Sequence, residues 1–293
     1  MTDTRPPPGT KVSVVVRSKN EAACIGRAML SLRAQTVRSQ IVLVDSGSTD
    51  DTLSLAAPFC DEVVRIPPDS FSFGRALNLG AERSSGDIVF ALSAHCVAED
   101  PAWMENSLVH YHDPAVAGTT GVPFGPDYGP LKGPRPISFH DVRSNPRWGF
   151  SNHASSWRRT AWEAVPFNEA LDSCEDKYWM WQVMLASWVV IADERLVVGS
   201  SHRRAAGMRA LWARKFTEHR VVAEWLDCPT GSAADLVREW WGSFPWPSRR
   251  PPWQRRLSPL RTAEIVAGYL GEWEGARRRG PGSLHLPTPP TAD

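Results

Sequence analysis

Short apolar runs alternate with amphipathic segments along the first hundred residues of the chain. Each run is rich in β-branched and aliphatic residues and ends in a polar turn, as "SVVV" before "RSKNE" does, which is typical of a buried strand. Between the runs, apolar residues recur at helical spacing, as Ile25, Met29 and Leu32 do. The pattern predicts strands at 12–16, 41–44, within 61–67 and at 88–92, with helices between them.

Strands that alternate with helices at this pace predict an α/β fold, with a mostly parallel sheet and helices on both faces. Asn20 is the expected cap of the first helix, and Ser48 or Asp50 of the second. The segment 118–138 is rich in glycine and proline and is expected to form a long irregular loop.

The second half of the chain changes from this alternation to a mostly helical pattern. A helix is expected through Trp181 and Met184, with strands near 189–192 and 196–198. From Met208 onward, amphipathic helices are separated by proline-rich turns. The predicted organisation is a disordered leader at 1–10, an α/β domain at 11–204, a helical C-terminal extension at 205–280 and a disordered tail at 281–293.

Composition narrows the class of protein. The chain has 293 residues with 33 basic and 32 acidic side chains, so its balanced charge does not favour nucleic acid as a partner. Its five cysteines contain no Cys-x-x-Cys pair, which argues against a zinc ribbon or a disulfide framework. No apolar stretch is long enough for a transmembrane segment, and no signal peptide is apparent. We therefore expect a cytoplasmic protein.

Four polar groups are candidates for chemistry, and each also has a plain structural interpretation. Asp45 in "VDSGSTDDT" follows a strand, but such a turn also suits a helix cap. Arg75 and Asn78 lie one helical turn apart, as residues on a solvated helix face also do. His95 ends a strand, where a histidine is often structural. The adjacent Glu175 and Asp176 also suit the first turn of a helix.

The order and spacing of these motifs change their interpretation. From about residue 11 to residue 204, "SVVVRSKNE", "IVLVDSGSTDD", "FGRALNLG", "ALSAH" and "CEDKYW" follow one another. This series resembles the family 2 glycosyltransferases of the GT-A fold, while the helical C-terminal third resembles them only loosely. The resemblance implies an inverting transfer of a sugar from a nucleoside diphosphate donor, with a UDP-sugar favoured over dTDP- or GDP-sugars.

The resemblance also implies roles for individual residues. Asp45 matches the aspartate that reads the nucleobase, and Asp176 matches the catalytic base, with Glu175 beside it. An inverting displacement needs such a carboxylate to take the acceptor's proton. The residues implied to bind the nucleotide sugar are Arg17, Ser18, Glu21, Asp45, Ser46, Arg75, Asn78, Ser93, Ala94 and His95.

One motif departs from the family. Ser93, Ala94 and His95 stand where the family places Asp-x-Asp to hold a divalent metal. His95 together with His202 would still offer two imidazoles, which favour Mn²⁺ over Mg²⁺. The alternative is a metal-free reaction, in which His95, Arg203 or Arg204 neutralises the diphosphate.

The sequence says least about the acceptor of the transferred sugar. Trp179 is a candidate for the acceptor site because aromatic faces suit sugar rings, and a small molecule, a carrier-bound intermediate or a glycan all stay open. The C-terminal helices are candidates for a homodimer interface. Two other classes of function compete: a non-catalytic nucleotide-sugar-binding protein that has lost Asp-x-Asp, and a nucleotidyltransferase, whose glycine-rich loop the chain lacks.

Overall fold

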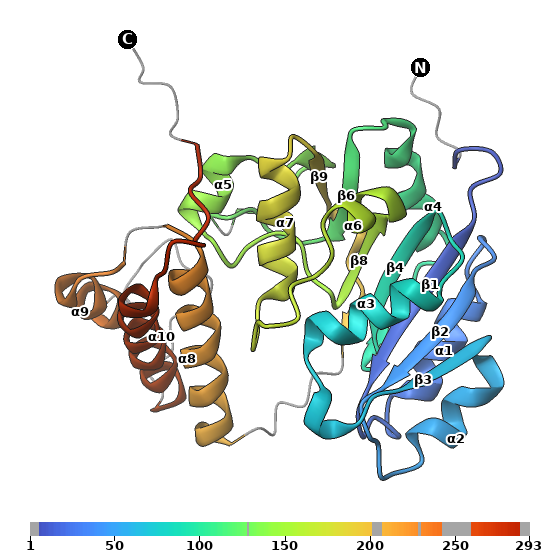
Figure 1. Cartoon of the computed structure of the whole chain (residues 1–293), viewed down its shortest axis with the longest axis horizontal. Coiled ribbons are helices and arrows are strands. Elements are labelled where there is room, and N and C mark those ends of the chain that lie inside the picture. Colours follow the sequence, from blue (N-terminus) through green and yellow to red (C-terminus); the bar gives the residue numbers. More distant parts are fainter. Residues whose placement is uncertain (1–5, 128, 201–206, 228–229, 242–258, 288–293) are drawn as a thin grey trace.

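The computed structural model describes residues 6–127, 129–200, 207–227, 230–241 and 259–287. A central sheet is flanked by helices, and a group of C-terminal helices lies at one end of the molecule (Figure 1). The sheet has eight strands in the order β3-β2-β1-β4-β8-β6-β9-β7. This arrangement confirms the predicted α/β class with a mostly parallel sheet and a helical C-terminal part.

The four predicted strands form one half of the sheet. They are β1 (Val12–Ser18), β2 (Gln40–Asp45), β3 (Glu62–Arg65) and β4 (Ile88–Ser93), and β1 pairs in parallel with both β2 and β4. Alternate residues of β3 are exposed, whereas both faces of β1, β2 and β4 are covered. In β1, Val14 and Val16 belong to one core and Val15 to the other. This two-sided burial explains why their sequences are continuous apolar runs.

Helices cover each face of the sheet. On one face, α1 (Ile25–Arg33) and α4 (Trp103–Leu108) contribute Met29 and Trp103 to a core. On the other, α3 (Phe73–Arg83), α6 (Arg159–Ala164) and α7 (Glu175–Leu185) pack Leu77, Ala161 and Trp179 against the strands.

The second half of the sheet mixes directions. Strand β8 (Ala154–Arg158) is antiparallel to both β4 and β6 (Val116–Gly121), while β9 (Val189–Asp193) runs parallel to β6, and β7 (Arg135–Pro136) closes this edge. The predicted loop 118–138 is therefore wrong at both ends, because 118–121 belong to β6 and 135–136 form β7. The backbone pairing of these short stretches leaves little trace in a sequence rich in glycine and proline.

Three local predictions also differ from the structure. The strand expected at 196–198 is absent; instead the 3₁₀ turn η4 (Glu194–Leu196) follows β9, because the Asp193 side chain accepts a hydrogen bond from the backbone of Arg195. Helix α1 begins after Cys24, not Asn20, whose positive φ of 54° places it in the preceding turn. Helix α2 (Thr52–Ala56) begins after Asp51, although the Asp50 carboxylate does accept from the Thr52 backbone.

The C-terminal helices dock onto the α/β part. Helices α8 (Met208–Trp225) and α10 (Pro259–Arg278) pack closely together, with α9 (Ala233–Trp241) beside them. The expected disordered tail is wrong for 281–287, because the Leu284 backbone pairs with Trp225 and Asp227, and Leu284 and Leu286 pack against the core. Within the leader, Thr10 forms a turn with Pro7.

The remaining elements are short. No helix in the described ranges is long and apolar enough to cross a bilayer. The four described cysteines, at 24, 60, 96 and 174, form no disulfide. The other elements are η1 (Ala57–Phe59), η2 (Pro68–Ser70), β5 (Cys96–Val97), η3 (Val109–His112), α5 (Phe139–Ser144) and β10 (Gly199–Ser200), which pairs with β5.

Candidate active site

The carboxyl ends of the central strands bring the predicted donor-side residues to one edge of the sheet. Because β1 is in register with its neighbours, Ser18 lies opposite Asp45 of β2 and Arg17 lies opposite Ser93 of β4. His95 follows two residues after β4 ends. The edge where parallel strands end is the usual place for ligands in such sheets.

The predicted catalytic carboxylates open α7. Glu175 is buried, with a side chain 7% exposed, whereas the Asp176 side chain is 16% exposed. Asp176 Oδ1 accepts from the backbone of Lys177 at 2.7 Å, and Oδ2 accepts from the Asn152 backbone at 3.2 Å. The preceding residue, Cys174, has φ of 59°, so the chain turns sharply just before the helix begins.

Arg17 connects the strand edge to this carboxylate pair. Its Nη1 lies 3.5 Å from Glu175 Oε1, and its Nη2 donates to the backbone oxygen of Asn152 at 3.3 Å. The guanidinium also lies over the Phe73 ring, 5.4 Å from its centroid. Arg17 Nε and Nη1 are buried and make no hydrogen bond to a described residue.

Burial determines the charge behaviour of Glu175. Desolvation raises its pKa, and the neighbouring Asp176 carboxylate raises it further, while Arg17 opposes both effects. The two adjacent carboxylates therefore have different environments: one is enclosed and holds its proton more strongly, and the other is more accessible.

His95 lies at the same edge of the sheet. Its Nδ1 is 3.5 Å from Glu21 Oε1, and its ring meets that of His153 edge-on at 5.6 Å between centroids. His153 follows Asn152, the residue that contacts Arg17, Glu175 and Asp176. The structure thus brings Arg17, Glu21, His95 and the carboxylate pair into one connected region.

Asp45 also lies at this edge, but its carboxylate is occupied by protein donors. Oδ1 accepts from the hydroxyls of Ser18 and Ser48, and Oδ2 accepts from the backbone of Gly47 and Ser48, all between 2.5 and 3.0 Å. The residue is 1% exposed. Because a carboxylate has about four acceptor positions, these bonds saturate it. The prediction that Asp45 reads the nucleobase is replaced by a role in holding the turn 45–48.

Asn78 is a second correction. Its Oδ1 accepts from Trp162 Nε1 and the Phe167 backbone, and its Nδ2 donates to Phe167 and Glu169. The amide ties α3 to the segment before α7, so it is not available to a nucleotide. Arg75, one turn earlier, is half-exposed and lies 3.9 Å from Glu169; its role toward a donor stays a prediction.

Trp179 is a third correction. Its side chain is fully buried, packs against Phe150 and Phe167, and donates from Nε1 to the backbone of Val165. A tryptophan in this position stabilises the core below α7 and cannot meet an acceptor.

The smaller predicted residues form the frame of the strand edge. Ser18 and Ser46 are buried, and both the backbone and the hydroxyl of Ser46 donate to the Ser18 carbonyl. The Ser93 hydroxyl lies 3.4 Å from the Asn152 carbonyl, and the Ala94 backbone donates to Arg17. These contacts fix the backbone on which Arg17 and His95 stand.

A divalent metal does not fit the described residues by themselves. In the described ranges, no three side chains among His, Cys, Asp and Glu cluster as a metal site. Glu21 lies beside His95, whereas Mg²⁺ needs a near-octahedral set of oxygens. His202, Arg203 and Arg204, the other groups expected near the diphosphate, lie outside the described residues.

Asn152 is the principal site residue that sequence reasoning missed. It lies in "FSNHASSW", just before β8, and is 2% exposed. The only signal in the sequence is a pair of polar residues, Asn152 and His153, beside a strand. That signal is weak because β8 is antiparallel, and its start, not its end, meets the functional edge.

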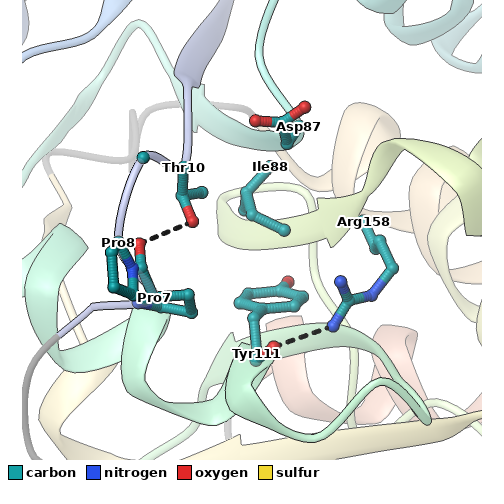
Figure 2. Close-up of a pocket in the computed structure, with 8 residues that line it drawn as sticks. Pro7, Pro8, Thr10, Asp87, Ile88, Tyr111 and Arg158 are labelled. Carbon is teal, nitrogen blue, oxygen red and sulfur yellow. Dashed lines mark hydrogen bonds between the residues drawn. The ribbon is translucent and has the colours of Figure 1, made fainter.

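A cavity of about 190 Å³ lies at the other end of the strands, away from the carboxyl ends of β1, β2 and β4. It is lined by residues that begin β4 or end β8, among them Ile88 and Arg158, together with Tyr111 and the turn at Pro7 (Figure 2). The Arg158 guanidinium there donates to three backbone carbonyls. None of the predicted site residues lines this cavity.

Comparison with known proteins identifies the family. The description "Glycosyl transferase family 2" matches residues 13–171, more than half of the chain. An O-antigen chain rhamnosyltransferase of Salmonella typhimurium is 22% identical over 214 residues, which are 66% of this chain and 67% of that protein. A second, of Salmonella anatum, is 31% identical over 84 residues, 28% of this chain and 27% of that protein.

Solved structures agree on the fold. A mannosyltransferase of Pyrobaculum calidifontis, in complex with GDP-Man and Mn²⁺, has a TM-score of 0.59 at 17% identity and covers 95% of this chain and 77% of its own. Glucosyl-3-phosphoglycerate synthase of Mycobacterium tuberculosis, with Mn²⁺ and UDP, has a TM-score of 0.54 at 18% identity and covers 73% of this chain and 78% of its own. The chain therefore belongs to glycosyl transferase family 2 and has the GT-A fold.

Proposed function

We propose that this glycosyltransferase moves a sugar from a nucleoside diphosphate donor to an acceptor hydroxyl with inversion, and that Asp176 is the base. The observation that carries the proposal is the connection of Arg17 to the Glu175–Asp176 pair at the carboxyl edge of the sheet. A cation there suits a diphosphate, and a carboxylate on the adjoining helix suits a hydroxyl nucleophile.

In the proposed reaction, the acceptor oxygen attacks the anomeric carbon as the bond from that carbon to the diphosphate oxygen breaks. The acceptor's proton passes to Asp176, and the electron pair of the broken bond leaves with the nucleoside diphosphate. Asp176 suits this role better than Glu175, because its carboxylate is the more exposed of the two. Holding both substrates in line supplies part of the ~7–11 kcal/mol available to ideal positioning.

Negative charge develops on the departing diphosphate. Arg17, beside Glu175, and His95, beside Glu21, are positive or proton-bearing groups at the strand edge. Loss of one such preorganised donor typically costs about 3–4 kcal/mol of transition-state stabilisation.

The sugar and the nucleobase of the donor are argued from different observations. Both curated relatives are rhamnosyltransferases, so we propose a rhamnosyl donor as the first candidate. The preference for uracil depended on Asp45, whose carboxylate is saturated by protein donors. We therefore propose no nucleobase preference from this residue, and the acceptor stays within the classes expected from the sequence.

The proposal is tested by ligand-induced stabilisation followed by turnover. UDP, dTDP and GDP, and their sugars including dTDP-rhamnose, are added with Mn²⁺, Mg²⁺ or EDTA, and the thermal midpoint is recorded. A ligand at about 100 times its Kd adds about 2.7 kcal/mol, a visible shift. If none of these ligands raises the midpoint, the nucleotide-sugar assignment is wrong.

Asp176→Asn separates an enzyme from a non-catalytic nucleotide-sugar-binding protein. The substitution keeps size and polarity but removes the base, so we expect an unchanged nucleotide-induced shift and a turnover lower by about 10²–10⁴-fold. Turnover is measured as release of nucleoside diphosphate from the responding sugar donor. Equal release by the variant and the parent protein would show that Asp176 is not the base.

A further inference from the structure

Asn152 lies between the donor side and the carboxylate side of the site. It is 2% exposed and sits in the turn that leads into β8, where the antiparallel strand places it beside the end of β4. No other described residue contacts Arg17, Ser93, Glu175 and Asp176 together through hydrogen bonds.

The contacts of Asn152 divide into two groups. Its backbone oxygen faces the donor side, accepting from Arg17 Nη2 at 3.3 Å and from the Ser93 hydroxyl at 3.4 Å. Its two N–H donors face the carboxylates: the backbone N–H donates to Asp176 Oδ2 at 3.2 Å, and Nδ2 donates to Glu175 Oε1 at 3.0 Å.

We propose that Asn152 is a positioning residue, which holds the Glu175 and Asp176 carboxylates in fixed register with Arg17. This inference rests on the proposed function. One residue then sets the spacing between the group that meets the diphosphate and the group that takes the acceptor's proton. Because an in-line displacement depends on that spacing, a small change in this turn alters the rate more than it alters donor binding.

The side-chain contact is the part that a substitution can remove. Two charged groups act on Glu175: Arg17 from β1 and Asp176 beside it on α7. Lys177 faces Asp176, with its Nζ 3.5 Å from Asp176 Oδ2. Desolvation and Asp176 favour the protonated form of Glu175, while Arg17 and the Asn152 amide favour its carboxylate. Without the amide, Glu175 holds its proton to higher pH.

The test uses Asn152→Leu, which has a similar shape but no donor. Titration of the side-chain carboxyl by ¹³C NMR of the Glu-labelled protein gives the pKa of Glu175, whose resonance is assigned by its absence in Glu175→Gln. We expect Asn152→Leu to raise that pKa, because the amide that stabilises the carboxylate is gone. Because the measurement needs no substrate, its outcome is independent of whether the proposed donor is right.

Turnover supplies the second measurement. With the donor that responds in the thermal panel, Asn152→Leu is expected to lower kcat by about tenfold or more while KM for the donor changes by about twofold or less, since the backbone contact to Arg17 remains. In a Glu175→Gln background, adding Asn152→Leu should produce no further shift in the pH dependence of turnover.

The matched control is Asn106→Leu on α4, which removes an amide that donates to Asp100 at 3.1 Å in an exposed position. It should leave the Glu175 pKa and the turnover unchanged. If Asn152→Leu folds poorly, Asn152→Ala replaces it in both measurements. An unchanged Glu175 pKa in the Asn152 variant, or equal losses in kcat and donor affinity, would overturn the positioning role.

Discussion

Asp45 and Asp176 show how differently two aspartates at one functional edge are used. Asp45 accepts four hydrogen bonds from its own turn and from Ser18. Asp176 accepts from two backbone N–H groups and keeps a partly exposed side chain. A saturated carboxylate stabilises the protein, whereas an accessible one is available to a substrate.

Asp45→Asn is therefore predicted to act on stability. An amide oxygen accepts from fewer donors than a carboxylate, so at least one buried donor among Gly47, Ser48 and Ser18 loses its partner. We expect the free energy of unfolding in urea to fall by about 1–3 kcal/mol, with the order of preference among UDP, dTDP and GDP unchanged. Asp69→Asn, at an exposed carboxylate, is the control. A changed nucleobase preference with unchanged stability would return Asp45 to the role of base reader.

The same contrast shows how far the sequence predicts the site. Motif order predicts Arg17, Glu175 and His95. Arg17 lies 3.5 Å from Glu175 and His95 lies beside Glu21, while their roles stay predictions. Motif order also predicts Asn78, and aromatic character suggests Trp179 for the acceptor, yet the polar groups of both bond within the protein. A motif gives the residue type and position, but the partners of a side chain depend on segments far away in the sequence, as Asn78 depends on Phe167.

At the scale of elements, the α8–α10 pair depends on glycine. Gly268, Gly271 and Gly275 recur at helical spacing along α10 and face α8. A Cβ on Gly271 would meet the Phe216 backbone oxygen, and one on Gly275 would meet the Arg220 backbone oxygen. The two helices therefore pack with their backbones unusually close, which no local propensity would suggest.

Gly271→Ala and Gly275→Ala are predicted to destabilise the protein. Since each new methyl group would meet backbone and not a flexible side chain, the helices must separate, at a cost of about 1–3 kcal/mol. The matched control is Gly26→Ala in α1, where a Cβ meets nothing within 4 Å; it should stabilise by about 0.5–1 kcal/mol. Thermal unfolding measures all three, and shifts in the same direction for Gly26→Ala and Gly271→Ala would contradict the close packing.

Strands that are buried on both faces are the easiest elements to predict from the sequence. Strands β1, β2 and β4 are covered on both faces, so their apolar runs are continuous and the sequence reveals them. The Leu196–Val198 run predicts a strand because it is equally apolar, but the Asp193 side chain turns the chain before it. The sequence does not predict the docking of 281–287, because its few backbone contacts are with Trp225 and Asp227, which are distant in the sequence.

At the scale of the whole molecule, one histidine joins the α/β part to the C-terminal helices. His219 of α8 donates from Nδ1 to Glu272 of α10 at 2.8 Å, while its Nε2 accepts from Arg147, in the segment between α5 and β8. The contact with Arg147 requires a neutral ring, because a protonated Nε2 would face the guanidinium. Burial lowers the pKa of His219, and Arg147 lowers it further, although Glu272 opposes them.

The sign of the pH dependence follows from this lowered pKa. The unfolded chain has the ordinary His219 pKa of 6.5, so below that pH the unfolded state binds the proton more readily than the folded state does. The contribution of His219 is fully present above the unfolded pKa and is lost as pH falls toward the folded pKa. We predict that the free energy of unfolding decreases between about pH 7.5 and about pH 5.5, and that His219→Gln removes part of this slope.

Urea unfolding of the parent protein and of His219→Gln at both pH values isolates this contribution, because the other titrating groups are common to the two proteins. The difference in stability between them should be larger at the higher pH, since only there does the parent protein keep a neutral His219 in both states. His140→Gln, at an exposed position, should show no such difference. If His219→Gln keeps the full slope of the parent protein, the Arg147–His219–Glu272 contact does not govern how the C-terminal helices are held at low pH.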